Sequence, residues 1–570
     1  MLNPSKFEDL FASDDATYEI PKYQRAYAWI DKQLDQLLTD LREQPVGKDY
    51  YLGHFLLERP DISKRHYYVI DGQQRLTTVA VFFSCLIAEL EKRKANGETL
   101  VDLDGGPVDT WRWEERYLIR RGLRRFRTVA VDDEFFRRAF IDRQPNAEPD
   151  PGRQSQKRLL NARQVLQKAL AAEAETATLL RWAHLLATAS VSAFEESDKV
   201  RATQIFAFQN DRGAKLTTLE KLKAYVMHRA YLDDETAQAS HTIDHVERIF
   251  ADIYTLTEEI DLGEDTVLRY HNIAFGASWE DAFENFKVGL RAAAPAAKSS
   301  WITEYCDSLR QSFLTVREVT RQAAGHSHVT GLLFLRSEDN WPLILKIQRH
   351  HGRDQALCER LYRLMEIVSF KLEFSTGDYR THEFHGLAKN YHGKPEALSQ
   401  TLREQAQNGF RWWWTFTQNF HDRLDGDQHY DRVTRYLLWQ YENWLRRASP
   451  NSMPVSGADF LNVWQVARWE GTLDHITPQH PHDTSYEEEF SKTRLHNLGN
   501  LALLMLGPNA SKQNKLPQHC IPIFANSTYL ADREIAGILQ AEGKWEEPQI
   551  LARKQRIVDF AKSYWAVPAN

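Results

Sequence analysis

The chain has 570 residues, which is too long for one hydrophobic core and predicts two to four domains. Its apolar fraction of 42% and charged fraction of 26% are ordinary for a globular protein, and no apolar run approaches the roughly 18 residues that cross a bilayer. The net charge of -7 argues against a protein that coats nucleic acid through overall basicity, but local basic patches remain possible.

The start of the chain and its cysteines indicate the compartment. The opening MLNPSKFEDLFASDD lacks the charged-then-apolar order of a signal peptide. The four cysteines form no CxxC pair, which is typical of buried thiols in a reducing environment and not of a disulfide frame or a zinc site. We therefore expect a cytoplasmic protein that makes no use of a membrane.

The first notable stretch is IPKYQRAYAW, residues 20–29. Pro21 keeps its entry extended, and Tyr23 and Tyr27 alternate as on a half-buried surface, with Gln24 and Arg25 between them. A helix capped by Asp31 should follow. Its buried face would carry Leu34, Leu37, Leu38 and Leu41. Two strands should come next, YYLGHFLLE and HYYVI.

A turn joins the second of these strands to a long helix. Gly72 permits a tight bend, and the free N–H groups of the new helix, with the fork of Arg75, predict an anion site. Asp71 could orient a ribose, a water or a metal, and Gln73 and Gln74 offer amides for a base or a phosphate. An ordinary capped turn explains the same residues equally well, and the GxxxxGK pattern of a Walker loop is missing.

Seven arginines lie between Arg112 and Arg127, against only Glu114 and Glu115. Arginine forks match phosphate oxygens, so this run predicts a contact with the DNA backbone. A solvated helix face is the alternative interpretation. The residues expected to make the contact are Arg120, Arg121, Arg124 and Arg125.

A second turn lies within IFAFQNDRGAKLTTLEKLKAYV, residues 205–226. Thr217 and Glu220 have the spacing of a capping box at the start of a new helix. Asn210 and Arg212 could close over the same pocket as the first turn, although turn chemistry alone would also explain them. From about 236 to 450 the chain is rich in helix-forming and aromatic residues and should form a helical connector.

Near the C-terminus, a strand-like run at residues 463–473 leads into Asp474-His475-Ile476. Asn500-Leu501 follows after a loop, and a final helix would carry Asn509 and Lys512. This order fits a ββα-metal (HNH) nuclease. His475 would be the general base, and Asp474 and Asn509 would offer oxygen ligands to one Mg²⁺ or Mn²⁺ ion.

Two further roles complete this predicted site. Asn500 would hold the His475 loop by hydrogen bonding, and Lys512 could contact a phosphate. The competing interpretation is a chance DHI tripeptide, with His480, His482 and His496 as neighbouring alternatives. Asn509 stands where this arrangement often has histidine, which is a departure from the usual pattern.

The chain resembles the GmrSD-type modification-dependent restriction proteins. The resemblance is carried by IPKYQRAYAW, YYVIDGQQRLTTV, the turn at residues 210–213 and the DHI-to-Asn509 region. It implies an α+β, mostly α-helical protein with a ParB/sulfiredoxin-like domain (residues 1–235), a helical connector (236–450) and an HNH nuclease domain (451–570). It also implies that the segment of Pro21, Tyr23, Gln24 and Arg25 senses a DNA modification.

From this resemblance we expect an antiphage DNA endonuclease that senses modified double-stranded DNA, bearing either phosphorothioate or glucosylated hydroxymethylcytosine. The turn at residues 71–75 would bind and hydrolyse a nucleoside triphosphate (GTP, ATP or another) that controls the nuclease. One alternative is a ParB-like nucleotide-switched DNA-binding protein with a degenerate nuclease module. Another is a nucleotidyl-transfer or toxin-type enzyme centred on the turn. A homo-oligomer remains possible.

Overall fold

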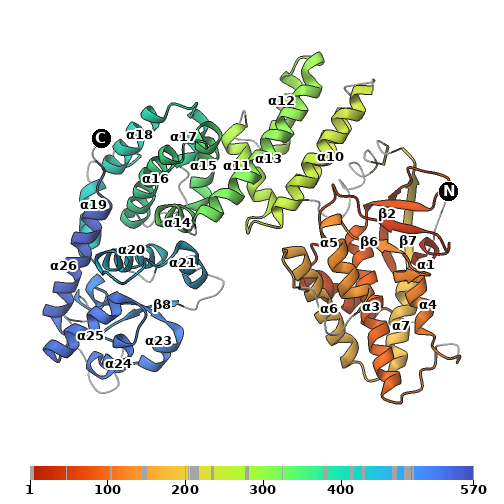
Figure 1. Cartoon of the computed structure of the whole chain (residues 1–570), viewed down its shortest axis with the longest axis horizontal. Coiled ribbons are helices and arrows are strands. Elements are labelled where there is room, and N and C mark those ends of the chain that lie inside the picture. Colours follow the sequence, from red (N-terminus) through yellow and green to blue (C-terminus); the bar gives the residue numbers. More distant parts are fainter. Residues whose placement is uncertain are drawn as a thin grey trace. The chain divides into compact units, whose positions relative to one another are not determined.

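The computed structural model describes residues 6–45, 48–102, 105–143, 150–198, 201–202, 205, 217–232, 237–276, 281–323, 325–376, 383–410, 416–426, 431–464, 471–479, 490 and 493–568. This part of the chain is mostly helical with one five-stranded sheet, which confirms the α+β class. It forms two compact units, residues 1–269 with 277–314 and residues 270–276 with 315–570 (Figure 1).

The first unit is built around a mixed sheet with strand order β6-β1-β3-β2-β7. Its strands are β1 (Thr17–Glu19), β2 (Tyr51–Glu58), β3 (His66–Asp71), β6 (Phe126–Arg127) and β7 (Ser190–Glu196). Strand β3 is parallel to β1 and antiparallel to β2, and β2 is parallel to β7. Both strands expected from YYLGHFLLE and HYYVI are therefore confirmed. The antiparallel pairing sets Leu56 of β2 opposite Asp71, the last residue of β3.

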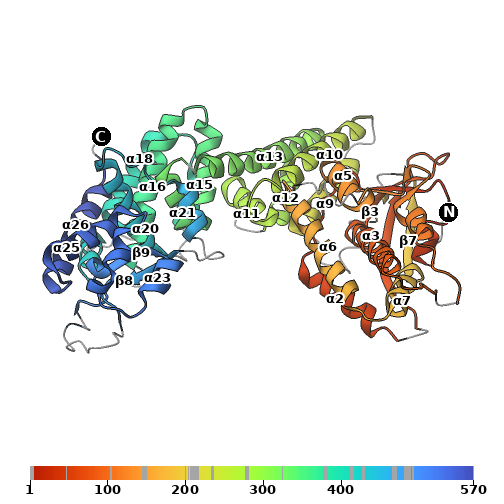
Figure 2. The same cartoon turned by 60° about the horizontal axis from the view of Figure 1, so that its bottom comes forward.

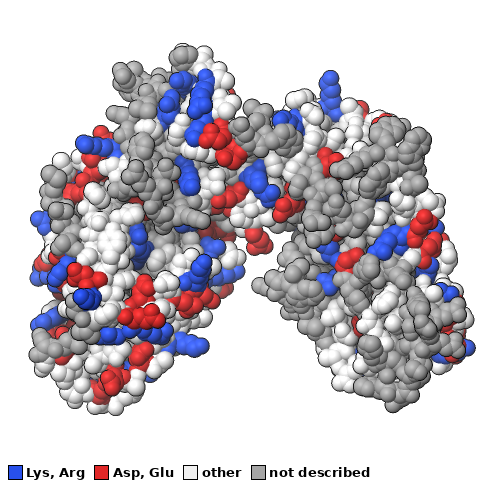
Figure 3. Space-filling model, turned by 180° about the vertical axis from the view of Figure 1, so that it is seen from behind, with Lys and Arg blue, Asp and Glu red and all other residues white. Residues whose placement is uncertain are grey.

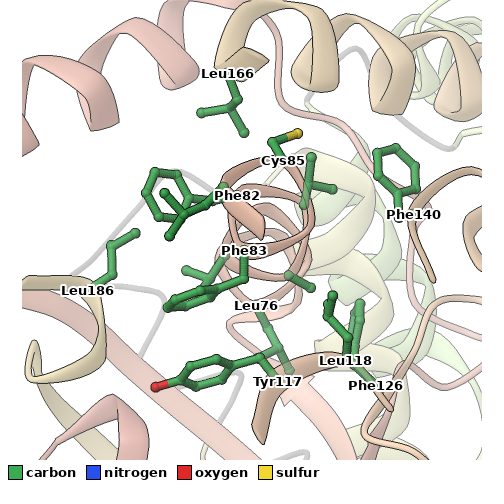
Figure 4. Packing of buried hydrophobic residues seen from close by; sticks show 14 of the residues in the cluster. Leu76, Phe82, Phe83, Cys85, Tyr117, Leu118, Phe126, Phe140, Leu166 and Leu186 are labelled. Atoms are coloured by element: carbon green, nitrogen blue, oxygen red, sulfur yellow. The ribbon is translucent and has the colours of Figure 1, made fainter. Parts of the chain in front are cut away.

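Helix α3 (Gln73–Ala95) lies at the centre of the core of this unit. Figure 4 shows its side chains packed among residues from several other elements, with Phe83 stacked on Tyr117 at a ring-centroid distance of 4.1 Å. The other helical segments here are α1 (Phe7–Leu10), α2 (Asp31–Glu43), α4 (Thr110–Trp113), η1 (Glu114–Leu118), α5 (Ala130–Phe136), η2 (Arg137–Ile141), α6 (Gln154–Ala172) and α7 (Thr176–Ala187). A two-residue ladder joins β4 (Ile119–Arg120) to β5 (Leu123–Arg124).

The helix expected after residue 29 is α2, and its four predicted leucines are all buried. Its cap differs from the prediction. The N-cap position is Ile30, and Asp31 is the first helical residue. A carboxylate in the first turn still favours the helix, because the exposed N–H groups there carry partial positive charge.

The capping box at residues 217–220 is confirmed. The backbone N–H of Glu220 donates to Thr217 Oγ1 at 3.2 Å, and the backbone N–H of Thr217 donates to Glu220 Oε2 at 2.9 Å. The helix that it starts is α9 (Thr218–Leu232), followed by α10 (Ala237–Thr257), α11 (Glu264–Phe275), α12 (Ala282–Ala292), η3 (Pro295–Ala297) and α13 (Lys298–Ala323). Helices α11 and α13 continue from one unit into the other.

The second unit is helical except for one pair of strands, within the described ranges. Its helices before these strands are α14 (Ser327–Phe334), α15 (Ser337–His351), α16 (Gln355–Thr376), α17 (Glu383–Asn390), α18 (Pro395–Asn408), α19 (Phe416–Asp425), α20 (Arg432–Ala448) and α21 (Gly457–Trp464). Every described element of the expected connector, residues 236–450, is helical, and the two units divide this range between them. Among the described residues, no helix combines the length and the apolar composition that crossing a bilayer requires.

The C-terminal elements form a strand–strand–helix arrangement. Strand β8 (Gly471–His475) pairs antiparallel with β9 (Leu501–Met505), and α23 (Leu506–Lys512) follows directly; Figure 2 shows the three side by side. The remaining segments are η4 (Leu498–Asn500), η5 (Pro517–Cys520), α24 (Ile521–Ala525), α25 (Leu530–Glu542) and α26 (Glu547–Tyr564). The strand predicted from residue 463 is wrong at its start, because Val463 belongs to helix α21 and β8 begins only at Gly471.

Candidate functional site

The turn at the end of β3 brings together an aspartate, an arginine and a histidine. Asp71 Oδ2 lies 2.5 Å from Nε2 of His54, which stands in the middle of β2, and 3.8 Å from the guanidinium of Arg75. Arg75 also donates to the backbone carbonyl of His54 at 2.7 Å. The three side chains are only partly exposed, by 16% for Asp71, 22% for Arg75 and 24% for His54, so a ligand can still reach them.

Two glycines make this convergence possible. Gly72, the N-cap of α3, has φ +92°, and a Cβ there would lie 2.5 Å from the ring of Phe55. Gly53 has φ +114°, and a Cβ there would lie 2.5 Å from the guanidinium of Arg75. Only glycine adopts such backbone angles without strain and leaves this room, so the arginine can lie against the backbone of β2.

The two glutamines of the turn differ in their surroundings. The side chain of Gln74 accepts from the backbone N–H of Ala28 at 2.8 Å and donates to the carbonyl of Ala26 at 3.0 Å. Gln74 therefore ties the turn to the preceding segment, whereas the prediction offered its amide to a ligand. Gln73 is buried at the first position of α3.

The segment from Pro21 to Arg25 is fixed to the same part of the fold. Gln24 donates to the carbonyl of Ile70 at 2.8 Å, and Arg25 pairs with Glu220 at 2.8 Å. The buried ammonium of Lys223 donates to the carbonyl of Tyr23 at 2.9 Å, and burial lowers the pKa of Lys223 to about 8. The segment thus lies between the end of β3 and helix α9.

Two cavities adjoin this segment. One, of about 320 Å³, is lined by Glu19, Ile20, Pro21, Lys22, Tyr23, Glu58, Tyr68, Ala130 and Glu247. A larger one, of about 610 Å³, lies between Arg25 to Ala28 and the connection from α10 to α11. The predicted residues Asn210 and Arg212 lie outside the described residues.

The arginine-rich run does not form the continuous phosphate-binding patch that was expected. Arg125 is fully buried, and its guanidinium donates to four backbone carbonyls, those of residues 11, 13, 14 and 116, so the predicted DNA contact is wrong for this residue. Arg120 pairs with Asp14 at 2.7 Å and Arg124 with Asp133 at 2.6 Å. Arg121 is exposed. Basic and acidic side chains are interspersed on the face shown in Figure 3.

In the second unit, α23 packs on β8 and places Lys512 beside Asp474. Lys512 Nζ lies 2.8 Å from Asp474 Oδ2, and the lysine is almost fully buried. Asn509 donates through Nδ2 to Thr472 Oγ1 at 2.8 Å. Thr472 and Asp474 are two residues apart on a strand and therefore face the same side, so Asp474, Asn509 and Lys512 gather there.

His475 is buried, and its Nε2 lies 3.1 Å from Nδ1 of His496. Burial lowers the pKa of His475 to about 3, and His496 and Lys512 shift it in the same direction. The imidazole is therefore neutral at physiological pH, which is the form that accepts a proton.

Asn500 holds the residues that follow His475. Its Oδ1 accepts from the backbone N–H of Thr477 at 2.9 Å and from the indole of Trp545 at 3.3 Å. Its Nδ2 donates to the carbonyl of Leu495 at 2.9 Å. The asparagine is fully buried, so each of these bonds is shielded from competing water.

The last helix, α26, completes this arrangement. Arg553 is fully buried and donates to the carbonyls of Gly499 at 2.9 Å and Leu501 at 2.7 Å, on either side of Asn500. A Cβ at Gly499 would lie 2.0 Å from the carbonyl of Ile550, so the helix approaches as closely as only a glycine permits. The segment carrying Asn500 is thus clamped from the end of the chain.

The donors near Asp474 fit one hard divalent cation. A carboxylate and an amide oxygen on one face, with water and phosphate oxygens, form the set that Mg²⁺ uses at a substrate site. Asp474 Oδ2 is buried and accepts no hydrogen bond, although the ammonium of Lys512 neutralises it. A bound cation would have to displace this ammonium. The described residues contain no group of three or more histidine, cysteine or acidic side chains that is placed to hold a metal ion.

Sequence reasoning overlooked His54 and considered His496 only as a competitor of His475. The signal for His54 was present in YYLGHFLLE, because antiparallel pairing of two consecutive strands places residues of the first beside the end of the second. His496 lies within the loop between β8 and β9. Its approach to His475 depends on the path of that loop, and the periodicity of the side chains does not encode this path.

Two family models match the chain. The model described as GmrSD restriction endonuclease, N-terminal domain, matches residues 7–227. The model described as GmrSD restriction endonucleases, C-terminal domain, matches residues 414–560. A search of curated proteins gave no match.

Proposed function

The chain belongs to the GmrSD restriction endonuclease family, and from this membership we propose an antiphage DNA endonuclease controlled by modified DNA and a nucleoside triphosphate. The family implies DNA as the substrate and cleavage as the activity. The strand–strand–helix element at residues 471–512 would be an HNH-type nuclease site. The turn at residues 71–75 would be the nucleotide site.

His475 carries the chemistry in this proposal. The neutral imidazole takes a proton from a water molecule, whose oxygen attacks the phosphorus as the bond to the leaving 3′ oxygen breaks. Asn500 keeps the backbone after His475 in place, and Arg553 keeps Asn500 in place. Lys512 offers a buried positive charge on the side where Asp474 and Asn509 gather.

Asp474 and Asn509 would hold one Mg²⁺ or Mn²⁺ ion. When bound, the ion would offset the charge that develops on the phosphate and on the leaving oxygen. The ammonium of Lys512, once displaced from the carboxylate, would be free to pair with a DNA phosphate. Lys512 and Asp474 thus neutralise each other's charge when the cation is not bound.

The first unit would sense the DNA and turn over the nucleotide. Arg75 and the start of α3 supply the positive charge for phosphates, and Asp71 and Gly72 shape the turn. Pro21, Tyr23, Gln24 and Arg25 would read a modification, either phosphorothioate or glucosylated hydroxymethylcytosine, since Pro21 and Tyr23 border one cavity and Arg25 the other. Arg121 is exposed and could meet the DNA backbone, whereas Arg120 and Arg124 would first have to leave their carboxylate partners.

The observation that carries the nuclease part is the neutral, buried His475 beside the side chains of Asp474, Asn509 and Lys512. The test incubates the full-length chain with matched plain, phosphorothioate and glucosylated plasmids, Mg²⁺ and each nucleoside triphosphate in turn. We expect nicking or linearisation of a modified plasmid and none with EDTA. If every plasmid stays intact under every combination, the proposed endonuclease is wrong.

One observation favours a second function. The contact between Lys512 and Asp474 occupies a predicted metal ligand, as in a nuclease module that has lost its activity and only binds DNA. The same incubations distinguish the two functions. A degenerate module would retain modified DNA in a gel-shift assay, with or without nucleotide, and would leave every plasmid uncut in Mg²⁺ and in Mn²⁺.

A further inference from the structure

We propose that His54 is the general base for nucleotide hydrolysis in the first unit, with Asp71 as the residue that positions it. The inference rests on the proposed nucleotide site and adds to it the group that receives the proton. It is carried by the contact of 2.5 Å between His54 Nε2 and Asp71 Oδ2, both buried atoms, beside the guanidinium of Arg75.

The contact favours one tautomer of His54. Nε2 and Asp71 Oδ2 lie 2.5 Å apart without the alignment of a hydrogen bond, and a neutral imidazole keeps its proton on the nitrogen that faces a carboxylate, because a lone pair there would be repelled. The lone pair is then on Nδ1. Within the described part of the chain, Nδ1 of His54 makes no hydrogen bond, and 24% of the side chain is exposed. A carboxylate-oriented imidazole with its other nitrogen open to water is a general-base arrangement.

The positive charge lies on the same side. Arg75 is held over Gly53 and donates to the carbonyl of His54, so its guanidinium adjoins the imidazole–carboxylate pair. The first N–H groups of α3, a helix of 23 residues, start at the same turn. A triphosphate drawn to these charges would bring its terminal phosphate within reach of a water molecule bound to His54.

The step balances as follows. Nδ1 of His54 removes a proton from water, and the water oxygen forms a bond to the γ-phosphorus. The bond between this phosphorus and the β–γ bridging oxygen breaks, and the diphosphate leaves with the electron pair. The products are a nucleoside diphosphate and inorganic phosphate, and His54 releases its proton to solvent. Asp71 stays ionised throughout and stabilises the imidazolium.

A second histidine of the same sheet serves as a matched control. His66, the first residue of β3, lies 3.6 Å from Glu19 through Nε2 and 3.0 Å from Thr17 Oγ1 through Nδ1. Both its ring nitrogens are thus engaged, and its strand position is at the far end from the turn. A purely structural role for histidine–carboxylate pairs would affect both sites alike.

The test measures hydrolysis of GTP and of ATP by full-length His54→Asn, Asp71→Asn and His66→Asn. Guanylyl and adenylyl imidodiphosphate serve as binding probes. We expect His54→Asn to lower kcat by about 10²–10⁴-fold while the Kd of the probe changes little. Asp71→Asn should also lower kcat, because an amide can donate to Nε2 and so favour the wrong tautomer. His66→Asn should turn over nucleotide normally.

Chemical rescue separates catalysis from folding. Added imidazole should restore part of the turnover of His54→Ala, since a small base can occupy the vacated space, whereas a misfolded protein would not recover. If His54→Asn keeps the wild-type kcat, or if His54→Ala is inactive without any recovery, the proposal is overturned and the nucleotide site remains. If the wild-type chain neither binds the probes nor hydrolyses a nucleotide, the nucleotide part of the proposed function fails as well.

Discussion

The two candidate sites use the same three kinds of residue in different pairings. Each has an aspartate at or near the end of a strand, a histidine beside it and a cation from the following helix. In the first unit Asp71 lies 2.5 Å from His54, with Arg75 at 3.8 Å. In the second unit Asp474 lies 2.8 Å from Lys512, and His475 approaches His496 at 3.1 Å.

This difference shows that the side chains beside an imidazole determine its role. Asp71 lies against its histidine and would stabilise the imidazolium form. Asp474 is neutralised by a lysine, and burial of His475, with His496 and Lys512 nearby, lowers the pKa of this imidazole to about 3. The first histidine lies against a negative charge, and the second is kept neutral by burial and by neighbouring cationic groups.

The largest expected effect is at His475. His475→Ala should lower DNA cleavage by about 10²–10⁴-fold, because the proposed acceptor of the proton is lost. Nucleotide hydrolysis should stay near the wild-type rate. Plasmid nicking and phosphate release, measured on one preparation, check both. His519→Ala, at an exposed position of the same unit, should cut normally. Metal-dependent cleavage by a folded His475→Ala protein would remove the assignment.

The next effect is at Arg75. Arg75→Ala should lower nucleotide hydrolysis by about 10²–10³-fold, because a preorganised positive donor is lost from the turn. Arg59→Ala is the control. Arg59 lies 5.6 Å from the ring of Tyr67, as Arg75 lies 5.6 Å from the ring of Phe55, but it pairs with Glu195 away from the turn. Equal nucleotide turnover by the two variants would show that Arg75 has no specific role in hydrolysis.

The packing of Arg75 against Gly53 can be disrupted without changing a charge. Gly53→Ala adds a Cβ at 2.5 Å from the guanidinium and at φ +114°, so we expect the arginine to be displaced. Gly97→Ala has a comparable φ of +88° but nothing within 4 Å. Gly53→Ala should therefore cost about 2 kcal/mol more in the free energy of unfolding, measured with urea, and should also slow nucleotide turnover. Equal costs would contradict the close contact.

The smallest expected effect is a change in how the stability of the first unit depends on pH. Burial raises the pKa of Glu264 to about 7; Glu220 and Asp265 add to this, and Thr217 and Arg25 oppose it. The stability contributed by protonated Glu264 is fully present below about pH 4.5 and is lost as the pH rises through about 7. Glu264→Gln should flatten this loss, of about 1–2 kcal/mol. Urea unfolding of both proteins at pH 5 and pH 8 measures it, and parallel curves would contradict it.

Local patterns predicted much of this fold, and distant contacts limited the rest. The leucine spacing of α2 and the strands β2 and β3 follow from periodicity, because burial of one face is encoded within a few residues. Arg125 was beyond such reasoning. Other arginines lie close to it in the sequence. Its burial depends on backbone carbonyls, and one of them belongs to Phe11, 114 residues earlier.

The residues of the candidate sites also fall into those predicted from local patterns and those that depend on distant contacts. Asp71, Gly72 and Arg75 were predicted together because a strand-to-helix turn is a local feature, and the structure does bring them together. His54 beside Asp71 and the approach of His496 to His475 were missed, since His54 and His496 come from other segments. The pair of Lys512 with Asp474 was also missed, because two residues 38 positions apart meet only when α23 packs on β8.

The clamp from α26 affects when the proposed nuclease site can form. Arg553 and Trp545 hold the segment around Asn500, and ribosomes make these two residues after the other residues of the site. A growing chain that already contains His475 would therefore lack the contacts that order its surroundings. Synthesis from N-terminus to C-terminus would delay assembly of the site until α26 has been made.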